Sequence, residues 1–217
     1  MTNQELFSYV DHTLLKPEAT PEQIAALCAE AAEHGTASVC VNGSYVPLAK
    51  KLLDGKAKVC AVIGFPLGAM STAAKAFEAA EAIRDGADEI DMVIHIGQLK
   101  AGNTDYVLED IKAVKAAIGD HILKVIIETC LLTEEEKITM CRLVTESGAE
   151  YIKTSTGFST GGATFDDVRL FAEHVGEGVK IKAAGGIRSR EDMEEFLRLG
   201  ASRLGTSSAV KILCGKN

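Results

Sequence analysis

Three charged residues stand in the middle of short apolar runs, where a charge needs a partner or a chemical task. Asp91 lies in EIDMV, Lys153 in YIKTS and Lys182 in KIKAA. If these runs are strands, alternation places each charged side chain on one face and its apolar neighbours on the other. A lone strand lysine or aspartate is more often structural. Two buried ammonium groups near one carboxylate are costly, however, so the three together indicate chemistry.

The two lysines suggest a particular chemistry, because two nearby ammonium groups repel each other. At a separation of about 5 Å and an effective dielectric of about 20, the repulsion is roughly 3 kcal/mol, or about two pKa units. It would bring a lysine pKa from about 10.4 towards 8, and burial would lower it further. A neutral amine attacks carbonyls and forms a Schiff base. We predict Lys153 as this nucleophile, with Asp91 and Lys182 relaying protons.

Two glycine-containing segments, AAGGIR at 183–188 and GTSSAVKIL at 205–213, predict an anion site. Glycine lets backbone N–H groups approach a ligand, and the start of the predicted short helix favours negative charge. The alternative is that the Gly-Gly pair only makes a turn, and that the polar residues after Lys153 only shape a loop. The predicted substrate- and phosphate-binding residues are Thr156, Gly157, Gly185, Gly186, Arg188, Gly205, Ser207 and Ser208.

Eight strand-like runs and the helical patterns between them would position these residues. Apolar stripes at helical spacing, such as Val107, Ile111, Val114 and Ile118, separate the runs. The predicted strands are YVDHTLL from 9, SVCVN from 38, KVCAVIGF from 58, EIDMVIH from 89, LKVIIET from 123, YIKTS from 151, KIKAAG from 180 and RLGTS from 203.

Short sequence patterns also predict where the helices begin and end. S/T-x-x-acid-or-amide patterns begin at Thr20, Thr133, Thr164 and Ser189 and predict capped helix starts. A Gly-Ala-polar connector at 86–88, 148–150 and 200–202 predicts helix ends, since glycine accepts the left-handed conformation there.

Strands that alternate with helices along the whole chain predict a parallel sheet. Eight such units in 217 residues favour a TIM (β/α)8 barrel, a single domain over 1–217. A doubly wound open sheet is the alternative, and the missing G-x-G-x-x-G after the first run counts against it. In a barrel, the carboxyl ends of the strands gather Asp91, Lys153 and Lys182 around one mouth.

Composition restricts the partners. The net charge of −8 argues against nucleic acid as the main partner, and the hydrophobic fraction of 47% is typical of a globular protein. No apolar run is long enough to span a membrane, and the N-terminus does not resemble a signal peptide. The six cysteines are scattered and no metal-ligand spacing occurs, so we expect reduced thiols, no metal and a cytoplasmic location. We expect His95 to make a simple hydrogen bond and Cys40 to be structural.

The motifs DHTLLKP, EIDMVI, KVIIET, YIKTSTGF, IKAAGGIR and GTSS occur here in the order typical of the deoxyribose-phosphate aldolases. The chain resembles the short bacterial forms of that family from Asp11 to Ser208. The resemblance implies a metal-independent, cofactor-free class I aldolase with a TIM barrel. It would cleave 2-deoxy-D-ribose 5-phosphate reversibly to glyceraldehyde 3-phosphate and acetaldehyde, in deoxyribonucleotide breakdown. By motif, Lys153 corresponds to the Schiff-base lysine, Asp91 and Lys182 to the proton-relay pair, and GGIR and GTSS to the phosphate site.

Three other functions remain open from the residues alone. The first is a class I aldolase or transaldolase for another sugar phosphate, and the second is a metal-assisted epimerase or isomerase on the same barrel. The third is a non-catalytic binder of phosphorylated sugars, which would gain nothing from a neutral lysine. We expect a small sugar phosphate as the partner, neither nucleic acid nor membrane, and a homodimer as the assembly. The chain ends in KILCGKN, without the tyrosine-ended tail of some longer family members.

Overall fold

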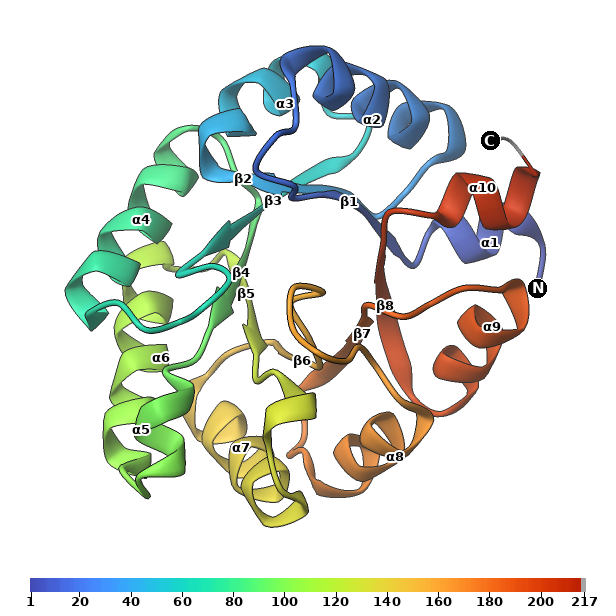
Figure 1. Ribbon diagram of the computed structural model, residues 1–217. Coiled ribbons are helices and arrows are strands. Elements are labelled where there is room, and N and C mark those ends of the chain that lie inside the picture. Colours follow the sequence, from blue (N-terminus) through green and yellow to red (C-terminus); the bar gives the residue numbers. More distant parts are fainter. Residues whose placement is uncertain (216–217) are drawn as a thin grey trace.

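The computed structural model describes residues 1–215, and these form a closed barrel of eight parallel strands with helices around it (Figure 1). Each strand pairs with the next along the chain, and β1 (Val10–Leu14) also pairs with β8 (Ala201–Thr206). The predicted TIM barrel is therefore confirmed, and the open sheet is excluded because no strand edge is left between β1 and β8. The last two residues of the predicted 1–217 domain lie outside the described part.

All eight predicted strands are present, within a few residues of their expected bounds. The other six strands are β2 (Ser38–Asn42), β3 (Lys58–Ile63), β4 (Glu89–Val93), β5 (Ile122–Ile126), β6 (Tyr151–Lys153) and β7 (Lys180–Ala184). β6 is the shortest strand. Its predicted continuation after Lys153 is a loop, in which the N–H of Thr154 donates to the carbonyl of Lys182 and the carbonyl of Thr154 accepts the N–H of Thr129.

Helices follow the strands and cover the outside of the barrel (Figure 1). They are α1 (Asn3–Phe7), α2 (Pro21–His34), α3 (Val46–Leu53), α4 (Thr72–Arg84), α5 (Ile96–Lys100), α6 (Thr104–Ile118), α7 (Glu134–Ser147), α8 (Phe165–His174), α9 (Arg190–Arg198) and α10 (Ala209–Cys214).

The predicted helix caps are confirmed. Thr20, Thr133 and Ser189 each form a reciprocal capping box, and the side chain of Thr164 accepts a hydrogen bond from the N–H of Asp167. These bonds satisfy backbone donors that have no partner within the helix. The three glycines of the Gly-Ala-polar connectors all have positive φ, so local sequence sets where these helices end.

Apolar side chains form two separate groups on the two sides of the strands. Ile90, Met92, Ile152 and Ile181 pack with helix residues in the large outer core. The second group lies inside the barrel and includes Cys40, Cys60 and Val62. Since neighbouring strand residues face opposite sides, the outward apolar residues direct Asp91, Lys153 and Lys182 inward, as the alternation predicted.

The N-terminus and α1 lie on the same side of the barrel as α10 (Figure 1). The side chain of Asn3 donates to the carbonyl of Leu213 at 2.8 Å, so α1 and α10 are in direct contact. Within residues 1–215, no helix has the length and apolar character needed to cross a bilayer.

Candidate active site

Asp91 lies at the centre of the barrel interior and accepts hydrogen bonds from lysines on three different strands. Its Oδ2 is 2.7 Å from Lys153 Nζ on β6 and 2.6 Å from Lys182 Nζ on β7. Its Oδ1 is 2.8 Å from Lys124 Nζ on β5. The two predicted lysines thus share one carboxylate oxygen, and the fold brings the three predicted catalytic residues into direct contact.

Lys124 is the largest omission of the sequence prediction. It is completely buried, and besides Asp91 it contacts Glu89 Oε2 at 2.7 Å and Cys60 Sγ at 3.2 Å. The signal was present: Lys124 stands between Leu123 and Val125, the same apolar-charged-apolar pattern that singled out the other three.

A second layer of charges lies next to this lysine–aspartate cluster. Arg203 Nη1 on β8 is 2.6 Å from Asp11 Oδ1 and 2.9 Å from Glu89 Oε2. Asp11 Oδ2 is in turn 2.5 Å from Lys182 Nζ, and Ser38 donates to Asp11 Oδ1 at 2.6 Å. Asp11 therefore links the arginine to Lys182. Asp11 lies on β1, and these partners come from β2, β7 and β8.

The charges of this interior fix the protonation of most of its members. Burial alone would raise the pKa of Asp91, but Lys124, Lys153 and Lys182 outweigh it and hold that pKa well below its usual range. Burial would lower the pKa of Lys182, but Asp11 and Asp91 raise it above that of a free lysine. Lys182 therefore keeps its proton and Asp91 its negative charge. The prediction considered only the repulsion between the Lys153 and Lys182 ammonium groups. In the structure Asp91 Oδ2 binds both groups, and its negative charge opposes that repulsion.

The loops after β6 and β7 pass each other very closely. A Cβ built on Gly162 would lie 2.5 Å from the carbonyl carbon of Gly185, and the N–H of Ala163 bonds to the carbonyl oxygens of Ala184 and Gly185. Gly185 and Gly186 both have positive φ, at 78° and 76°. These glycines are needed for the turn and for the close approach of the two loops.

Thr156 was predicted to bind the substrate or its phosphate, but its hydrogen-bond partner in the structure is Glu128. Its hydroxyl donates to Glu128 Oε2 at 2.5 Å, its N–H bonds to Oε1 at 3.2 Å, and its oxygen accepts the N–H of Phe158 at 3.0 Å. Glu128 is buried and has a positive φ of 56°, which is uncommon for a residue with a side chain. The alternative reading of Thr156 as a loop-shaping residue thus agrees with its contacts, and Glu128 is a buried carboxylate that the prediction missed.

The other predicted anion-binding residues differ in their exposure. Arg188 and Ser207 are exposed, and Ser208 is half-buried at the start of α10. Gly157 is also exposed, while Gly205 is buried and its carbonyl accepts the N–H of Gly185 at 3.3 Å. α10 has 6 residues and is thus the short helix that was predicted after the last strand.

His95 makes the simple hydrogen bond that was expected. Its Nδ1 accepts the N–H of Gln98 at 3.3 Å at the start of α5, and its ring meets Tyr106 edge-on. It therefore serves as a helix cap.

Cys40 is buried inside the barrel, on the strand next to Cys60. Ligand atoms of these two cysteines and Asp91 all lie within 4.8 Å of one another. Three ammonium groups already bind Asp91, however, and would repel a divalent cation at the same place.

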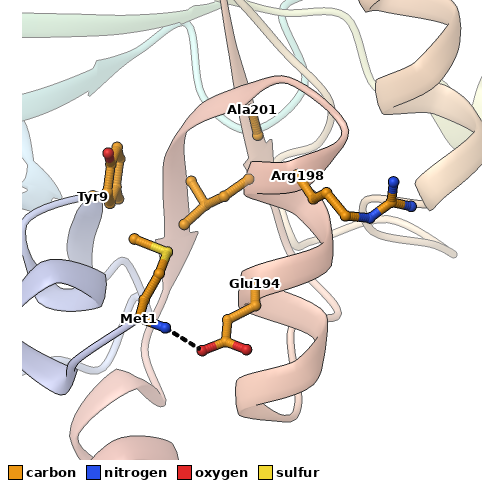
Figure 2. Close-up of a pocket in the computed structure, with 6 residues that line it drawn as sticks. Met1, Tyr9, Glu194, Arg198 and Ala201 are labelled. Atoms are coloured by element: carbon orange, nitrogen blue, oxygen red, sulfur yellow. Dashed lines mark hydrogen bonds and ion pairs between the residues drawn. The ribbon is translucent and has the colours of Figure 1, made fainter.

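The cavity in Figure 2 lies away from this cluster, near the amino ends of β1 and β8. It measures about 440 Å³ and is lined by residues that include Tyr9, Arg198 and Ala201. Glu194 there bonds to the N-terminal amine of Met1 at 3.3 Å (Figure 2). Active sites of such barrels lie at the carboxyl ends of the strands, so we assign the site from the lysine cluster.

The buried lysine at the end of β6 is hydrogen-bonded to a carboxylate and lies close to a second amine. Such a site in a parallel barrel defines a class of protein, the barrel enzymes suited to carbonyl chemistry. The comparisons with known proteins agree. The DeoC/LacD family aldolase model matches residues 6–217, so the chain belongs to that family.

Individual relatives extend the comparison. Deoxyribose-phosphate aldolase of Streptococcus suis (strain 98HAH33) is 59% identical over 212 residues, which cover 97% of this chain and 96% of the relative. A solved aldolase named QR15 has a TM-score of 0.94 at 40% identity and covers 97% of this chain and 95% of its own. The deoxyribose phosphate aldolase of Aeropyrum pernix, described as tetrameric, has a TM-score of 0.89 at 32% identity and covers 99% and 92%.

Proposed function

We propose that this protein is a class I aldolase that reversibly cleaves 2-deoxy-D-ribose 5-phosphate to D-glyceraldehyde 3-phosphate and acetaldehyde. The observation that carries the proposal is the shared hydrogen bonding of Lys153 and Lys182 to Asp91 Oδ2. Membership in the DeoC/LacD aldolase family and the likeness to relatives named deoxyribose-phosphate aldolase support the substrate.

The first half of the reaction forms an imine. Neutral Lys153 Nζ adds to the aldehyde carbon of the open-chain sugar, and the resulting carbinolamine loses water to give a protonated imine. Lys182 is the neighbouring acid, since it keeps its proton, and it can protonate the departing hydroxyl. Asp91 contacts both nitrogens and stabilises the positive charge on the imine.

The second half breaks the carbon–carbon bond. A base removes the proton from the hydroxyl two carbons from the imine, and Asp91 with Lys182, through a water molecule, supplies this base. The bond between the second and third carbons then breaks, and its electrons pass to the iminium, which becomes an enamine. Glyceraldehyde 3-phosphate leaves, the enamine is protonated, and hydrolysis releases acetaldehyde and free Lys153.

The phosphate of the substrate is assigned to the loops after β7 and β8. Gly185 and Gly186 have the backbone conformation of a turn that presents N–H groups, and Arg188, Ser207 and Ser208 lie nearby in the same two segments. Gly157 and Gly205 keep the surrounding backbone free of side chains. Binding energy from the phosphate would orient the reacting end of the sugar. Thr156 would act indirectly, by shaping the loop through Glu128.

The test has two parts. The first is a coupled assay for glyceraldehyde 3-phosphate release from deoxyribose 5-phosphate, with a panel of other sugar phosphates and with chelator present. We expect turnover that survives chelation and disappears in Lys153→Ala. The second is borohydride reduction in the presence of acetaldehyde, which should leave an ethyl group on Lys153. An adduct on another residue would overturn the assignment of the nucleophile, and binding without turnover would indicate a sugar-phosphate binder.

We also propose a cytoplasmic enzyme of deoxyribonucleotide catabolism that works without metal or cofactor, as a homodimer. The sequence supports the location, since its six cysteines are scattered and lack the spacing of a disulfide framework. Cell fractionation tests the location. Light scattering on the purified protein tests the assembly, and the tetramer described for the Aeropyrum pernix relative is the main alternative outcome.

A further inference from the structure

We propose that Lys124 is the residue that makes Lys153 the one cation of the barrel interior able to release its proton. This inference rests on the proposed function, in which Lys153 must be neutral to attack an aldehyde. Lys124 is a buried lysine on β5 and would touch no reacting atom. Its role would be to set the electrostatic surroundings of the nucleophile, Lys153.

The first argument is the distribution of ion pairs. Lys124 lies within 4.0 Å of carboxylate oxygens of Asp11, Glu89 and Asp91. Lys182 pairs with Asp11 and Asp91.

Arg203 pairs with Asp11 and Glu89. Among residues 1–215, by contrast, Asp91 is the only carboxylate within ion-pair distance of Lys153. Lys153 is therefore held least firmly of the four cations.

The second argument is the charge balance of the interior. Three cations, Lys124, Lys182 and Arg203, match the three carboxylates, so a proton on Lys153 leaves one positive charge in excess. An excess buried charge is costly, and losing this proton removes it. The titratable and charged groups that line this interior are Asp11, Cys40, Cys60, Glu89, Asp91, Lys124, Tyr151, Lys153, Lys182 and Arg203.

Two further charges, Lys58 and Glu128, lie at the ends of this interior, and among residues 1–215 neither forms an ion pair with Asp91 or Lys153. Lys58 reaches Glu89 Oε1 at 3.4 Å, but its side chain is 53% exposed and water screens it. The carboxylate of Glu128 is bound to Thr156 in the loop region after β5 and β6.

The third argument is geometric. Lys124 occupies Oδ1 of Asp91, while Lys153 and Lys182 compete for Oδ2. Because Lys124 neutralises part of the negative charge of Asp91, Asp91 attracts the Lys153 ammonium less strongly. Without Lys124, Asp91 would hold the Lys153 ammonium more strongly, and the charge excess would vanish. Both effects favour the protonated, unreactive form of Lys153.

The experiment measures how trapping of an imine on Lys153 depends on pH. Protein is mixed with acetaldehyde and cyanoborohydride at a series of pH values between about pH 5 and pH 10. The ethyl group on Lys153 is then quantified by peptide mass spectrometry. The midpoint is the pH at which the rate of trapping reaches half of its maximum. In Lys124→Met we expect this midpoint to move up by about 1 to 2 pH units, with roughly 10- to 100-fold slower trapping near pH 7.

Glu89→Gln provides a test of opposite sign. It removes one carboxylate that pairs with Lys124 and Arg203, so the positive excess grows and the midpoint should move down. The double variant Lys124→Met/Glu89→Gln removes one charge of each sign and should return the midpoint close to that of the wild type. A merely structural role for Lys124 would not produce opposite shifts that cancel.

The outcomes separate this inference from the proposed function. Opposite shifts that cancel in the double variant support it. If wild-type protein gives no ethyl group on Lys153, the proposed function and this inference both fail. If the adduct forms but the midpoints stay together or move in the same direction, only the role of Lys124 is overturned. Should Lys124→Met fail to fold, as circular dichroism would show, Glu89→Gln and the double variant still decide the sign.

Discussion

Lys182 and Lys180 lie two residues apart on β7 but have very different surroundings. Lys182 is fully buried against Asp11 and Asp91, whereas Lys180 is exposed. Because a buried, hydrogen-bonded ammonium can deliver and recover protons at a fixed place, the structure supports separate roles for the two lysines.

We expect Lys182→Met to lower kcat by about 10²- to 10⁴-fold, since one proton-transfer group contributes about that much. Lys153 remains in place, so reduction with acetaldehyde should still label it, but more slowly near neutral pH, because this variant, like Lys124→Met, removes one cation of the interior. Steady-state assays together with peptide mapping check both results. Lys180→Met is the matched control and should keep wild-type turnover, and full activity in Lys182→Met would contradict the proposed relay.

Cysteine reactivity should follow burial. Burial raises the pKa of Cys28 to about 11 and that of Cys141 to about 12, while Cys130 and Cys214 are exposed. Since only the thiolate reacts with iodoacetamide, native protein near pH 8 should be alkylated first at Cys130 and Cys214. Cys28 and Cys141 should react only after unfolding. Mass spectrometry of digests over time measures the order, and early labelling of Cys141 would contradict its burial.

At the scale of elements, the loops after β6 and β7 act as one unit. The N–H of Ala163 bonds to the carbonyls at the end of β7, and Gly162 has no room for a side chain against Gly185. The nucleophile at the end of β6 and the proposed phosphate site after β7 are thereby held at a fixed separation. This coupling depends on backbone contacts between the two loops.

Gly162→Ala tests this coupling. The new methyl group would lie 2.5 Å and 2.6 Å from the carbonyl carbon and oxygen of Gly185, so the loops must move apart. We expect a loss of about 1–3 kcal/mol in the free energy of unfolding. We also expect a KM for the sugar phosphate roughly tenfold higher, equivalent to about 1.4 kcal/mol of binding.

Unphosphorylated deoxyribose should show a smaller change in kcat/KM, because it does not use the phosphate loops. Gly43→Ala is the control, since a Cβ there meets nothing within 4 Å. An unchanged KM in Gly162→Ala would show that the loop after β7 does not hold the phosphate.

At the scale of the whole molecule, the interior of the barrel is a charged layer with members from β1, β4, β5, β6, β7 and β8. Burial would raise the pKa of Asp11, but Lys182, Lys124 and Arg203 lower it well below its usual range. The pKa of Glu89 is also lowered, by Lys124 and Arg203 against the effect of burial. Carboxylates with depressed pKa stabilise the fold above the pKa of the unfolded chain and lose that contribution as pH falls.

We therefore expect Tm to be steady near neutral pH and to fall steeply below about pH 4, where unfolded carboxylates begin to take up protons. The raised pKa of Lys182 and Arg203 works in the other direction, and their contribution persists until strongly alkaline pH. Calorimetry across the acid range measures the decline. Glu109→Gln, at an exposed helix pair with Lys112, should leave the profile unchanged, while a flat acid profile in the wild type would contradict the ionised cluster.

The sequence by itself determined the barrel, because the information is local. Alternating apolar residues, Thr and Ser caps and glycine helix ends each act within a few residues of the chain, and all eight strands and the four capped helices follow from them. The same alternation was enough to direct Asp91, Lys153 and Lys182 into the interior.

The tertiary structure alone decided which charges touch. Lys124 and Glu89 bind each other from neighbouring strands, Arg203 and Asp11 meet where β8 closes on β1, and Glu128 binds Thr156 across two loops. These pairings depend on strand register and barrel closure, which no short stretch of sequence encodes. The protonation of a buried group depends on every charge around it, so the state of the lysines follows from the closed barrel and not from the YIKTSTG motif.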